Sequence, residues 1–294
     1  RRQRQMCIRD RCLHWNKPCV CCIIHIIMKT KIAILTKAES STEKDMFVAA
    51  IKQSDDFGVC IVNSGKDVPQ DCKNLIVFGG DGTVLEAVKN VGDDVIVTGI
   101  NGGNLGFLTQ FEKDCAIEDI LNSIKDGKFD KRMTLEVDCD DLHDTALNEI
   151  VLKSATSRPV FIDVYVDGKF VDSYHSDGAI VSSPTGSTAY SLSAGGPVLA
   201  PDVDAIVIIP ICAHSLHSRP LVVNSNSKIR LQLAKSEIAT LCADGENIAN
   251  ISGDKCITIE KSAKYIKFLA VKEDNFYKKL LNKMNRWGSV DPRG

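Results

Sequence analysis

The chain has 294 residues, of which 44% are hydrophobic and 25% are charged, and its formal net charge is -2. This length and composition suit one large globular domain or two smaller ones with an extensive core. The balanced charge excludes the strongly basic surface typical of nucleic-acid-binding proteins, and no apolar run approaches the roughly 20 residues of a membrane-spanning helix. We therefore expect neither nucleic acid nor a membrane as a partner.

The first 27 residues differ in composition from the rest of the chain. They contain six Lys or Arg residues against one Asp and five of the twelve cysteines. Three interpretations are open: a non-native or disordered leader over residues 1–27, with Met28 as the natural start; a small metal site around Cys21 and His25; or part of a signal sequence. The cysteine spacing fits no standard zinc pattern and no small-residue cleavage site follows, so we predict a leader.

The remainder, residues 28–294, carries a net charge of -7 and seven scattered cysteines. Because no regular spacing links these cysteines, they indicate free thiols rather than a disulfide framework. We therefore expect a reducing, cytoplasmic location.

Residues 28–128 have the pattern of an α/β domain, in which buried strands alternate with helices. Ser40 and Glu43 have the spacing of a capping box, and Gly127 is a stop signal for a later helix. The predicted strands cover residues 32–36, 58–63, 74–78 and 94–100, and the predicted helices begin near residue 40 and cover 83–91 and 114–125. This alternation predicts a mostly parallel sheet with helices on its faces.

After residue 128 the hydrophobic period changes to two, which is typical of strands, and residues 129–273 form a predicted β-rich domain. Asp167-Gly168 is a strong hairpin signal, because both central residues of a type I′ turn need positive φ. The predicted strands cover residues 134–139, 145–153, 160–166, 169–175, 179–183, 205–211, 221–223, 228–233, 238–243, 256–260 and 265–270.

The terminal segment, residues 274–294, begins with a predicted helix over residues 274–287. Its helical spacing puts Phe276, Leu280, Met284 and Trp287 on one face. We expect this closing helix to pack back against the N-terminal domain.

A glycine-rich turn, Gly79-Gly80-Asp81-Gly82-Thr83, joins a predicted strand to a predicted helix. Such turns let backbone N–H groups approach phosphate oxygens at a helix N-terminus, although a plain tight turn capped by Asp81 is the structural alternative. A carboxylate among phosphate-binding amides would repel the ligand, so its presence favours proton abstraction or a role through a metal ion. The turn matches neither a Walker A loop nor the dinucleotide-binding glycine fingerprint.

A second motif, residues 183–197, reads SPTGSTAYSLSAGGP and combines closely spaced hydroxyls with small residues. Such a segment can hydrogen-bond ribose and amide groups at close range, and Tyr190 can stack on a base. Asn148 and Glu149 stand in an otherwise apolar strand, where unpaired polar groups are costly, which favours a functional role for them. These residues suit a polar, planar ligand better than a lipid.

The glycine-rich turn resembles that of a kinase superfamily that includes phosphofructokinases, diacylglycerol and sphingosine kinases, and NAD kinases. Residues 183–197 resemble the signature of the NAD kinases in particular, and the resemblance extends to residues 101–109, 147–149 and 219–221. It covers nearly all of residues 31–271. Two departures are Gly102, where the family commonly has Arg, and Ser183, where it commonly has Thr.

The resemblance implies transfer of the γ-phosphoryl group of ATP to the 2′-hydroxyl of the adenosine ribose of NAD, which yields NADP and ADP. It implies Mg²⁺ or another divalent metal, bound through the ATP phosphates rather than at a fixed protein site, and a homodimer or homotetramer. Asp81 is the implied proton acceptor, and Gly79, Gly80, Gly82 and Thr83 form the implied phosphate loop. The implied NAD-binding residues are Asp81, Gly82, Asn148, Glu149, Arg158, His175, Asp177, Thr188, Ala189, Tyr190, Ser191, Leu192, Ser193 and Glu246.

Structural roles remain open for Arg158 as a solvated hairpin residue, His175 as a strand residue and Glu246 as a turn residue. Two other functions also remain as alternatives. A diacylglycerol-type lipid kinase shares the glycine-rich turn but needs an apolar acyl channel. A non-catalytic NAD(H)-binding sensor would keep the pocket without the transfer reaction.

Overall fold

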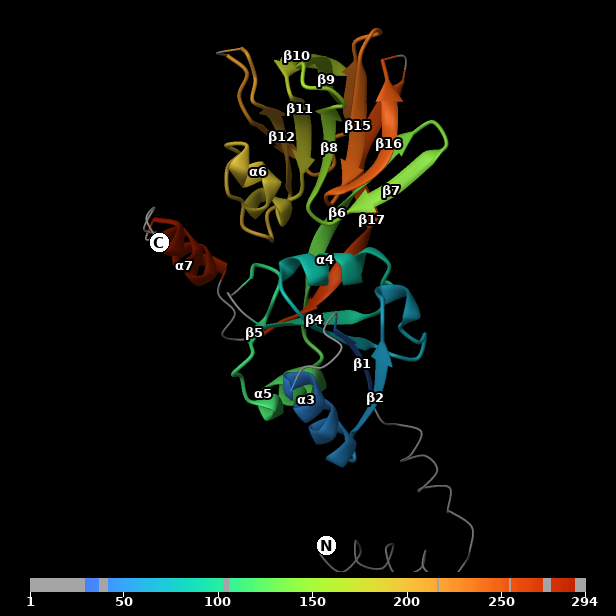
Figure 1. Cartoon of the computed structure of the whole chain (residues 1–294), viewed down its shortest axis with the longest axis vertical. Coiled ribbons are helices and arrows are strands. Elements are labelled where there is room, and N and C mark those ends of the chain that lie inside the picture. Colours follow the sequence, from blue (N-terminus) through green and yellow to red (C-terminus); the bar gives the residue numbers. More distant parts are fainter. Residues whose placement is uncertain are drawn as a thin grey trace, which may run out of the picture.

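The structure is a computed structural model that describes residues 30–36, 42–102, 106–215, 217–253, 255–271 and 276–288. The predicted leader of residues 1–27 and the capping residue Ser40 lie outside this part of the chain. Figure 1 shows an N-terminal half with helices around a sheet and a C-terminal half built from strands. Among the described helices, none is long and apolar enough to cross a membrane.

The N-terminal half is a parallel sheet with helices on both faces (Figure 1). Its strands pair in the order β4-β3-β1-β2, as predicted from the alternating pattern. Helices α3 and α5 bury Phe47 and Ile124 against one face, whereas α4 buries Val84 and Val88 against the other. Gly127 ends α5 with a φ of 63°, as predicted. The elements are β1 (Thr30–Thr36), α3 (Thr42–Gln53), β2 (Phe57–Val62), η1 (Gly65–Asp67), β3 (Asn74–Phe78), α4 (Asp81–Lys89), β4 (Ile96–Asn101), β5 (Phe111–Glu112) and α5 (Ile117–Asp126).

Two long strands, β6 (Phe129–Cys139) and β17 (Cys256–Leu269), carry this sheet into the C-terminal half. β17 pairs in parallel with β4 at Lys267 and Phe268 and antiparallel with β6 along most of its length. The sheet continues through β14 (Ile229–Leu233), β9 (Val160–Val166) and β10 (Lys169–Ser176), and β7 (Leu142–Ala146) pairs with β6. One 11-stranded sheet therefore crosses residue 128 without interruption.

A second, six-stranded antiparallel sheet packs against the C-terminal part of the first. The shared core includes Leu135 and Ile162 from the first sheet and Leu152 and Leu241 from the second, all fully buried. This is the face-to-face arrangement of a β-sandwich. The strands, in spatial order, are β13 (Leu221–Asn224), β12 (Ala205–Ile211), β11 (Gly178–Ser182), β8 (Glu149–Ser154), β15 (Ile238–Ala243) and β16 (Glu246–Ser252).

The fold class is confirmed, but one predicted strand is wrong. Residues 145–153 form two strands, β7 and β8, which are separated at Leu147 and Asn148. The backbone N–H groups of both residues donate to the Asp244 carboxylate instead of to a neighbouring strand. Conversely, the segments predicted at 256–260 and 265–270 form the single strand β17, with a bulge between Lys261 and Tyr265.

The Asp167-Gly168 hairpin is confirmed, with φ values of 51° and 77°. A similar turn at Asp244-Gly245, with φ values of 49° and 83°, joins β15 to β16. The sequence pattern gave no signal for β16, because its residues alternate weakly between apolar and polar. Helix α4 begins at Asp81, two residues before its predicted start.

The closing helix α7 (Phe276–Gly288) packs on the N-terminal half, as expected. Phe276 lies with its ring centroid 6.1 Å from that of Phe107. The predicted contact face is wrong at Met284, which is exposed, whereas Lys279 is buried and donates to the Thr109 carbonyl. The predicted contact of Trp287 lies outside the described side chains.

Candidate active site

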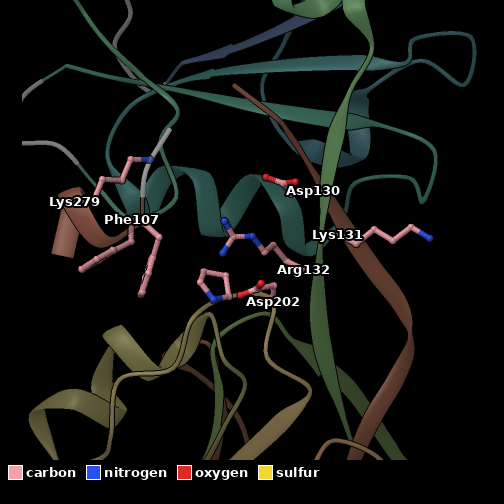
Figure 2. Close-up of a pocket in the computed structure, with 8 residues that line it drawn as sticks. Phe107, Asp130, Lys131, Arg132, Asp202 and Lys279 are labelled. Atoms are coloured by element: carbon pink, nitrogen blue, oxygen red, sulfur yellow. The ribbon is translucent and has the colours of Figure 1, made fainter. Parts of the chain in front are cut away.

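A cavity of about 330 Å³ lies at the junction of α7 with the two halves of the protein. Figure 2 shows α4 behind it and Phe107 and Lys279 at one side, while Lys131 points away from the other labelled side chains. Loop 106–109, as we call residues 106–109, forms one wall through Phe107. The lining residues are Phe107, Asp130, Lys131, Arg132, Pro201, Asp202, Phe276 and Lys279.

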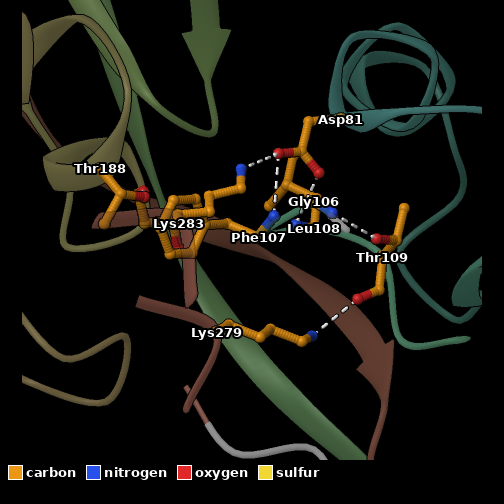
Figure 3. Close-up of polar contacts among 9 residues, drawn as sticks. Asp81, Gly106, Phe107, Leu108, Thr109, Thr188, Lys279 and Lys283 are labelled. Carbon is orange, nitrogen blue, oxygen red and sulfur yellow. Dashed lines mark hydrogen bonds and ion pairs between the residues drawn. The ribbon is translucent and has the colours of Figure 1, made fainter. Parts of the chain in front are cut away.

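Asp81, the acidic residue of the glycine-rich turn, lies in the first turn of α4 (Figure 3). Its side chain does not cap the helix, whose N-cap residue is Gly80 and which has no side-chain cap. Instead, Oδ2 accepts the Phe107 N–H and Oδ1 accepts the Leu108 N–H, both at 2.9 Å. Lys283 of α7 is a third partner, with Nζ 3.4 Å from Oδ2. The carboxylate is therefore fixed between α4, loop 106–109 and α7.

Two glycines allow close packing around the glycine-rich turn, Gly106 against Asp81 and Gly79 against Thr83. A Cβ at Gly106 would lie 1.9 Å from Asp81 Oδ1, and a Cβ at Gly79 would lie 2.7 Å from Thr83 Oγ1. Real Cβ atoms do not make such contacts, so only glycine fits without movement. By contrast, a Cβ at Gly80 or Gly82 would meet no atom of the part of the chain that the structure describes within 4 Å. These two glycines leave open space beside the N-terminus of α4.

Asp244 organises the second group of predicted site residues. Its carboxylate accepts the backbone N–H groups of Leu147, Asn148 and Glu149 at 2.7, 2.7 and 3.2 Å. Burial raises the pKa of Asp244, although these three amides oppose the rise. This residue was not among those selected from the sequence. Its positive φ and its distance of 95 to 97 residues from its partners explain why no local pattern marked it.

Residues 183–197 lie against residues 147–149, the segment whose amides donate to Asp244. The Ser183 hydroxyl donates to the Leu147 carbonyl, and a Cβ at Gly186 would lie 2.1 Å from the Asn148 carbonyl oxygen. The segment then forms η2 (Gly186–Thr188) and α6 (Tyr190–Ser193). Figure 1 shows α6 beside the second sheet, on the side of the molecule where α7 lies.

Three buried polar side-chain atoms in this region have no hydrogen-bond partner among the described residues: Glu149 Oε2, Thr185 Oγ1 and Ser191 Oγ. Unpaired buried polar atoms are costly, so a group of them indicates a ligand-binding position. Other hydroxyls of the segment are used internally, since Ser187 and Thr188 donate to the carbonyls of Pro184 and Thr185. Sequence reasoning selected Glu149 and Ser191 but not Thr185.

The Glu149 side chain is only 6% exposed, and burial together with the charge of Asp244 raises the pKa of its carboxyl from 4.5 to about 8. The backbone amide of Tyr190 opposes the rise. Two carboxyl groups that share a buried position commonly keep one proton at neutral pH.

This shift predicts the pH dependence of stability in the ligand-free protein. Because the pKa of Glu149 is raised in the folded state, the protonated carboxyl favours folding. This contribution to the free energy of unfolding is lost as pH rises from about 4.5 to about 8. Glu149→Gln removes this titration. The free energy of unfolding of Glu149→Gln minus that of the parent should therefore be roughly 2–4 kcal/mol larger at about pH 9 than at about pH 5, as measured by urea unfolding. Glu118→Gln, on the exposed surface of α5, is the control. An equal difference from the parent at both pH values for Glu149→Gln would contradict the argument.

Tyr190, Asp177 and Glu149 lie in one neighbourhood. Burial raises the pKa of the Tyr190 hydroxyl, and the Cys212 thiol and the Asp177 and Glu149 carboxylates raise it further. Tyr190 is nevertheless 42% exposed, so its ring is accessible to a ligand. The structure thus brings together the predicted residues of β8, the start of β11 and α6.

The other predicted site residues have structural partners of their own. Glu246 is exposed and its Oε2 lies 2.6 Å from Lys89 Nζ of α4, which ties β16 to the N-terminal half. His175 stacks on Phe161, with ring centroids 4.3 Å apart, and its carbonyl accepts the His214 N–H. Arg158 lies exposed in the turn between β8 and β9.

Comparisons with known proteins match both halves of the chain. A family model of the ATP-NAD kinase N-terminal domain matches residues 3–129, and one of the ATP-NAD kinase C-terminal domain matches residues 147–271. An NAD kinase of Flavobacterium psychrophilum is 37% identical over 238 residues, which are 77% of this chain and 80% of that protein.

Two solved structures are also similar. Yeast NADH kinase complexed with NADH has a TM-score of 0.78 at 27% identity, over 90% of this chain and 89% of that one. An Archaeoglobus fulgidus NAD kinase in complex with ATP has a TM-score of 0.76 at 27% identity, over 89% of this chain and 100% of that one. These matches define the class of protein as a kinase that phosphorylates a nucleotide. The chain belongs to the NAD kinase family.

Proposed function

We propose that Asp81 is the proton acceptor when this NAD kinase transfers the γ-phosphoryl group of ATP to the 2′-hydroxyl of the adenosine ribose of NAD. The observation that carries the proposal is the position of the Asp81 carboxylate, which projects from the first turn of α4 and is fixed by two backbone amides of loop 106–109. Among the described residues, Oδ1 accepts one hydrogen bond, from the Leu108 N–H, which leaves it a lone pair for a substrate hydroxyl. A carboxylate held in this way accepts a proton in one orientation.

The glycine-rich turn is the proposed phosphate site. Gly80 and Gly82 leave open space beside the N-terminus of α4, where backbone N–H groups and the helix dipole favour anions. Gly79 keeps the strand end close to Thr83. Phosphoryl transfer needs positioning and charge neutralisation more than covalent chemistry, and this turn supplies both.

The proposed NAD pocket comprises Asp81, Gly82, Asn148, Glu149, Asp177 and residues 188–193. The unpaired buried atoms of Glu149, Thr185 and Ser191 support it, because ribose hydroxyls and amide groups would satisfy them. The accessible ring of Tyr190 would stack on a base. We add Thr185 to the predicted set for this reason. Glu246 is a weaker member because it already pairs with Lys89.

A divalent cation such as Mg²⁺ fits this site. The buried Glu149 Oε2 has no partner among the described residues, and carboxylate oxygens are the donors that Mg²⁺ prefers. When bound, the cation neutralises charge on the ATP phosphates. With the cation bound, Glu149 would be held ionised beside Asp244. In the ligand-free protein, its raised pKa of about 8 disfavours this ionised form.

We propose that the chain forms a homo-oligomer through β9 and β10. β10 ends the 11-stranded sheet, and Phe161, Phe170 and Val171 are exposed there. An exposed apolar edge strand is a typical interface. The predicted NAD contacts of Arg158 and His175 belong to this side of the protein, and His175 stacks on Phe161.

The seven cysteines of the described chain, all free, support a reducing cytoplasmic location.

The test is NADP formation by the purified chain from NAD and ATP with Mg²⁺, followed in a coupled assay. We expect steady turnover that depends on all three components. Binding of NAD without transfer would instead support the sensor alternative. Transfer to a diacylglycerol and not to NAD would support the lipid-kinase alternative.

A further inference from the structure

The C-terminal helix brings a lysine to the proposed proton acceptor. Lys283 Nζ lies 3.4 Å from Asp81 Oδ2 and 4.0 Å from the centroid of the Phe107 ring, and Figure 3 shows it pointing at the carboxylate. The Lys283 side chain is 24% exposed and that of Asp81 is 33% exposed. This ammonium group therefore lies between an anion and an aromatic face, both of which attract it.

The position of Lys283 follows from the way α7 is anchored. Phe276, Lys279 and Lys283 lie at helical spacings of three and four residues, so they share one face. Phe276 contacts the Phe107 ring, and the buried Lys279 donates to the Thr109 carbonyl at 2.7 Å. The same face thus contacts loop 106–109 at three successive points. Lys283 is held by this packing rather than placed by a single surface ion pair.

The contact decides which lone pair of Asp81 remains available. A carboxylate oxygen has two lone pairs in its plane. Among the described residues, Oδ2 accepts the Phe107 N–H and the Lys283 ammonium, whereas Oδ1 accepts only the Leu108 N–H. Lys283 therefore leaves Oδ1 as the oxygen with free capacity for a further hydrogen bond.

We propose that Lys283 is a positioning residue for phosphoryl transfer, which acts by holding the Asp81 carboxylate oriented with Oδ1 toward the acceptor hydroxyl. The proposal rests on the role of Asp81 as proton acceptor. It assigns to α7 a part in catalysis beyond packing, because the helix supplies one of the three partners of the reacting carboxylate.

The first experiment compares Lys283→Met, Lys283→Arg and Lys278→Met in the full chain. Met keeps the length of the side chain and its contact with Phe107 but removes the charge, and Lys278 is an exposed lysine on the same helix. We expect Lys283→Met to lower kcat by about fivefold to tenfold with KM for NAD and ATP within about twofold. Arg should restore most of kcat, and Lys278→Met should match the parent. A kcat for Lys283→Met within twofold of the parent, or an equal loss in Lys278→Met, would overturn the proposal.

The second experiment repeats Lys283→Met in an Asp81→Asn background. If Lys283 acts through Asp81, the second substitution should change the residual kcat by less than about twofold. The same loss in both backgrounds would mean that Lys283 acts independently of Asp81, which contradicts the inference. The single variant Asp81→Asn distinguishes failure of the proposed role of Asp81 from failure of the proposed role of Lys283. If Asp81→Asn keeps parental turnover, the role of Asp81 is wrong. If Asp81→Asn is impaired but Lys283→Met keeps parental turnover, only the role of Lys283 is wrong.

Discussion

Replacing Asp81 with Asn is expected to lower kcat for NADP formation by about 10² or more, which is the usual size of a general-base effect. The variant keeps the shape of the side chain but loses the charge and the ability to take the proton of the 2′-hydroxyl. Steady-state kinetics with NAD and ATP measures the effect. Turnover close to that of the parent would remove Asp81 from the role of proton acceptor.

The control for this variant must account for loop 106–109. Both Asp81 oxygens accept backbone N–H groups, and an amide can accept only one of them, so Asp81→Asn also loses a local hydrogen bond worth about 1 kcal/mol. Thr109→Val removes another hydrogen bond of the same loop, the one that Gly106 N–H donates to Thr109 Oγ1. We expect Thr109→Val to lose stability of similar size but to keep kcat within about threefold. If both variants lost activity equally, the loss would reflect the loop and not the base.

Gly106→Ala is expected to lower kcat by roughly 10² through geometry alone, since small displacements of reacting groups have effects of this size. The added Cβ would lie 1.9 Å from Asp81 Oδ1 and 2.6 Å from its Cγ, so the carboxylate must leave its place between the loop amides. The chemical groups of the site are all retained. Kinetics and a thermal unfolding curve should therefore show a large loss of kcat with a moderate loss of stability.

Gly102→Ala is the matched control, because a Cβ at Gly102 meets no atom of the described residues within 4 Å. We expect parental kinetics from it. An active Gly106→Ala variant would show that the carboxylate tolerates displacement, and the tight contact between loop 106–109 and Asp81 would then have no catalytic importance.

Much of the fold follows from local pattern. Apolar runs bounded by turn residues identified the parallel strands around Val77 and Val97, and Asp167-Gly168 identified a hairpin, because period and turn chemistry act over a few residues. The strand predicted at 145–153 was wrong because its amides bond to Asp244, almost a hundred residues later. No pattern within the strand carries that information.

The candidate site divides in the same way. The glycine-rich turn and residues 183–197 could be selected from the sequence because their residue types are unusual over short stretches. Thr185 could not be separated from its neighbouring hydroxyls, since only burial shows which hydroxyls are left without partners. Lys283 gave no signal, because a lysine on an amphipathic helix is ordinarily a solvated residue.

The pairing of β17 with β4 has a consequence for the order in which the protein is built. During synthesis, residues 30–128 emerge before β17, and the start of β4 then lacks the neighbour that it will acquire at Lys267 and Phe268. An unpaired edge of a buried parallel sheet exposes backbone N–H and C=O groups that can pair with a strand of another chain. The N-terminal half therefore completes its sheet only after β17 has left the ribosome, and until then the edge of β4 is open to pairing with other chains.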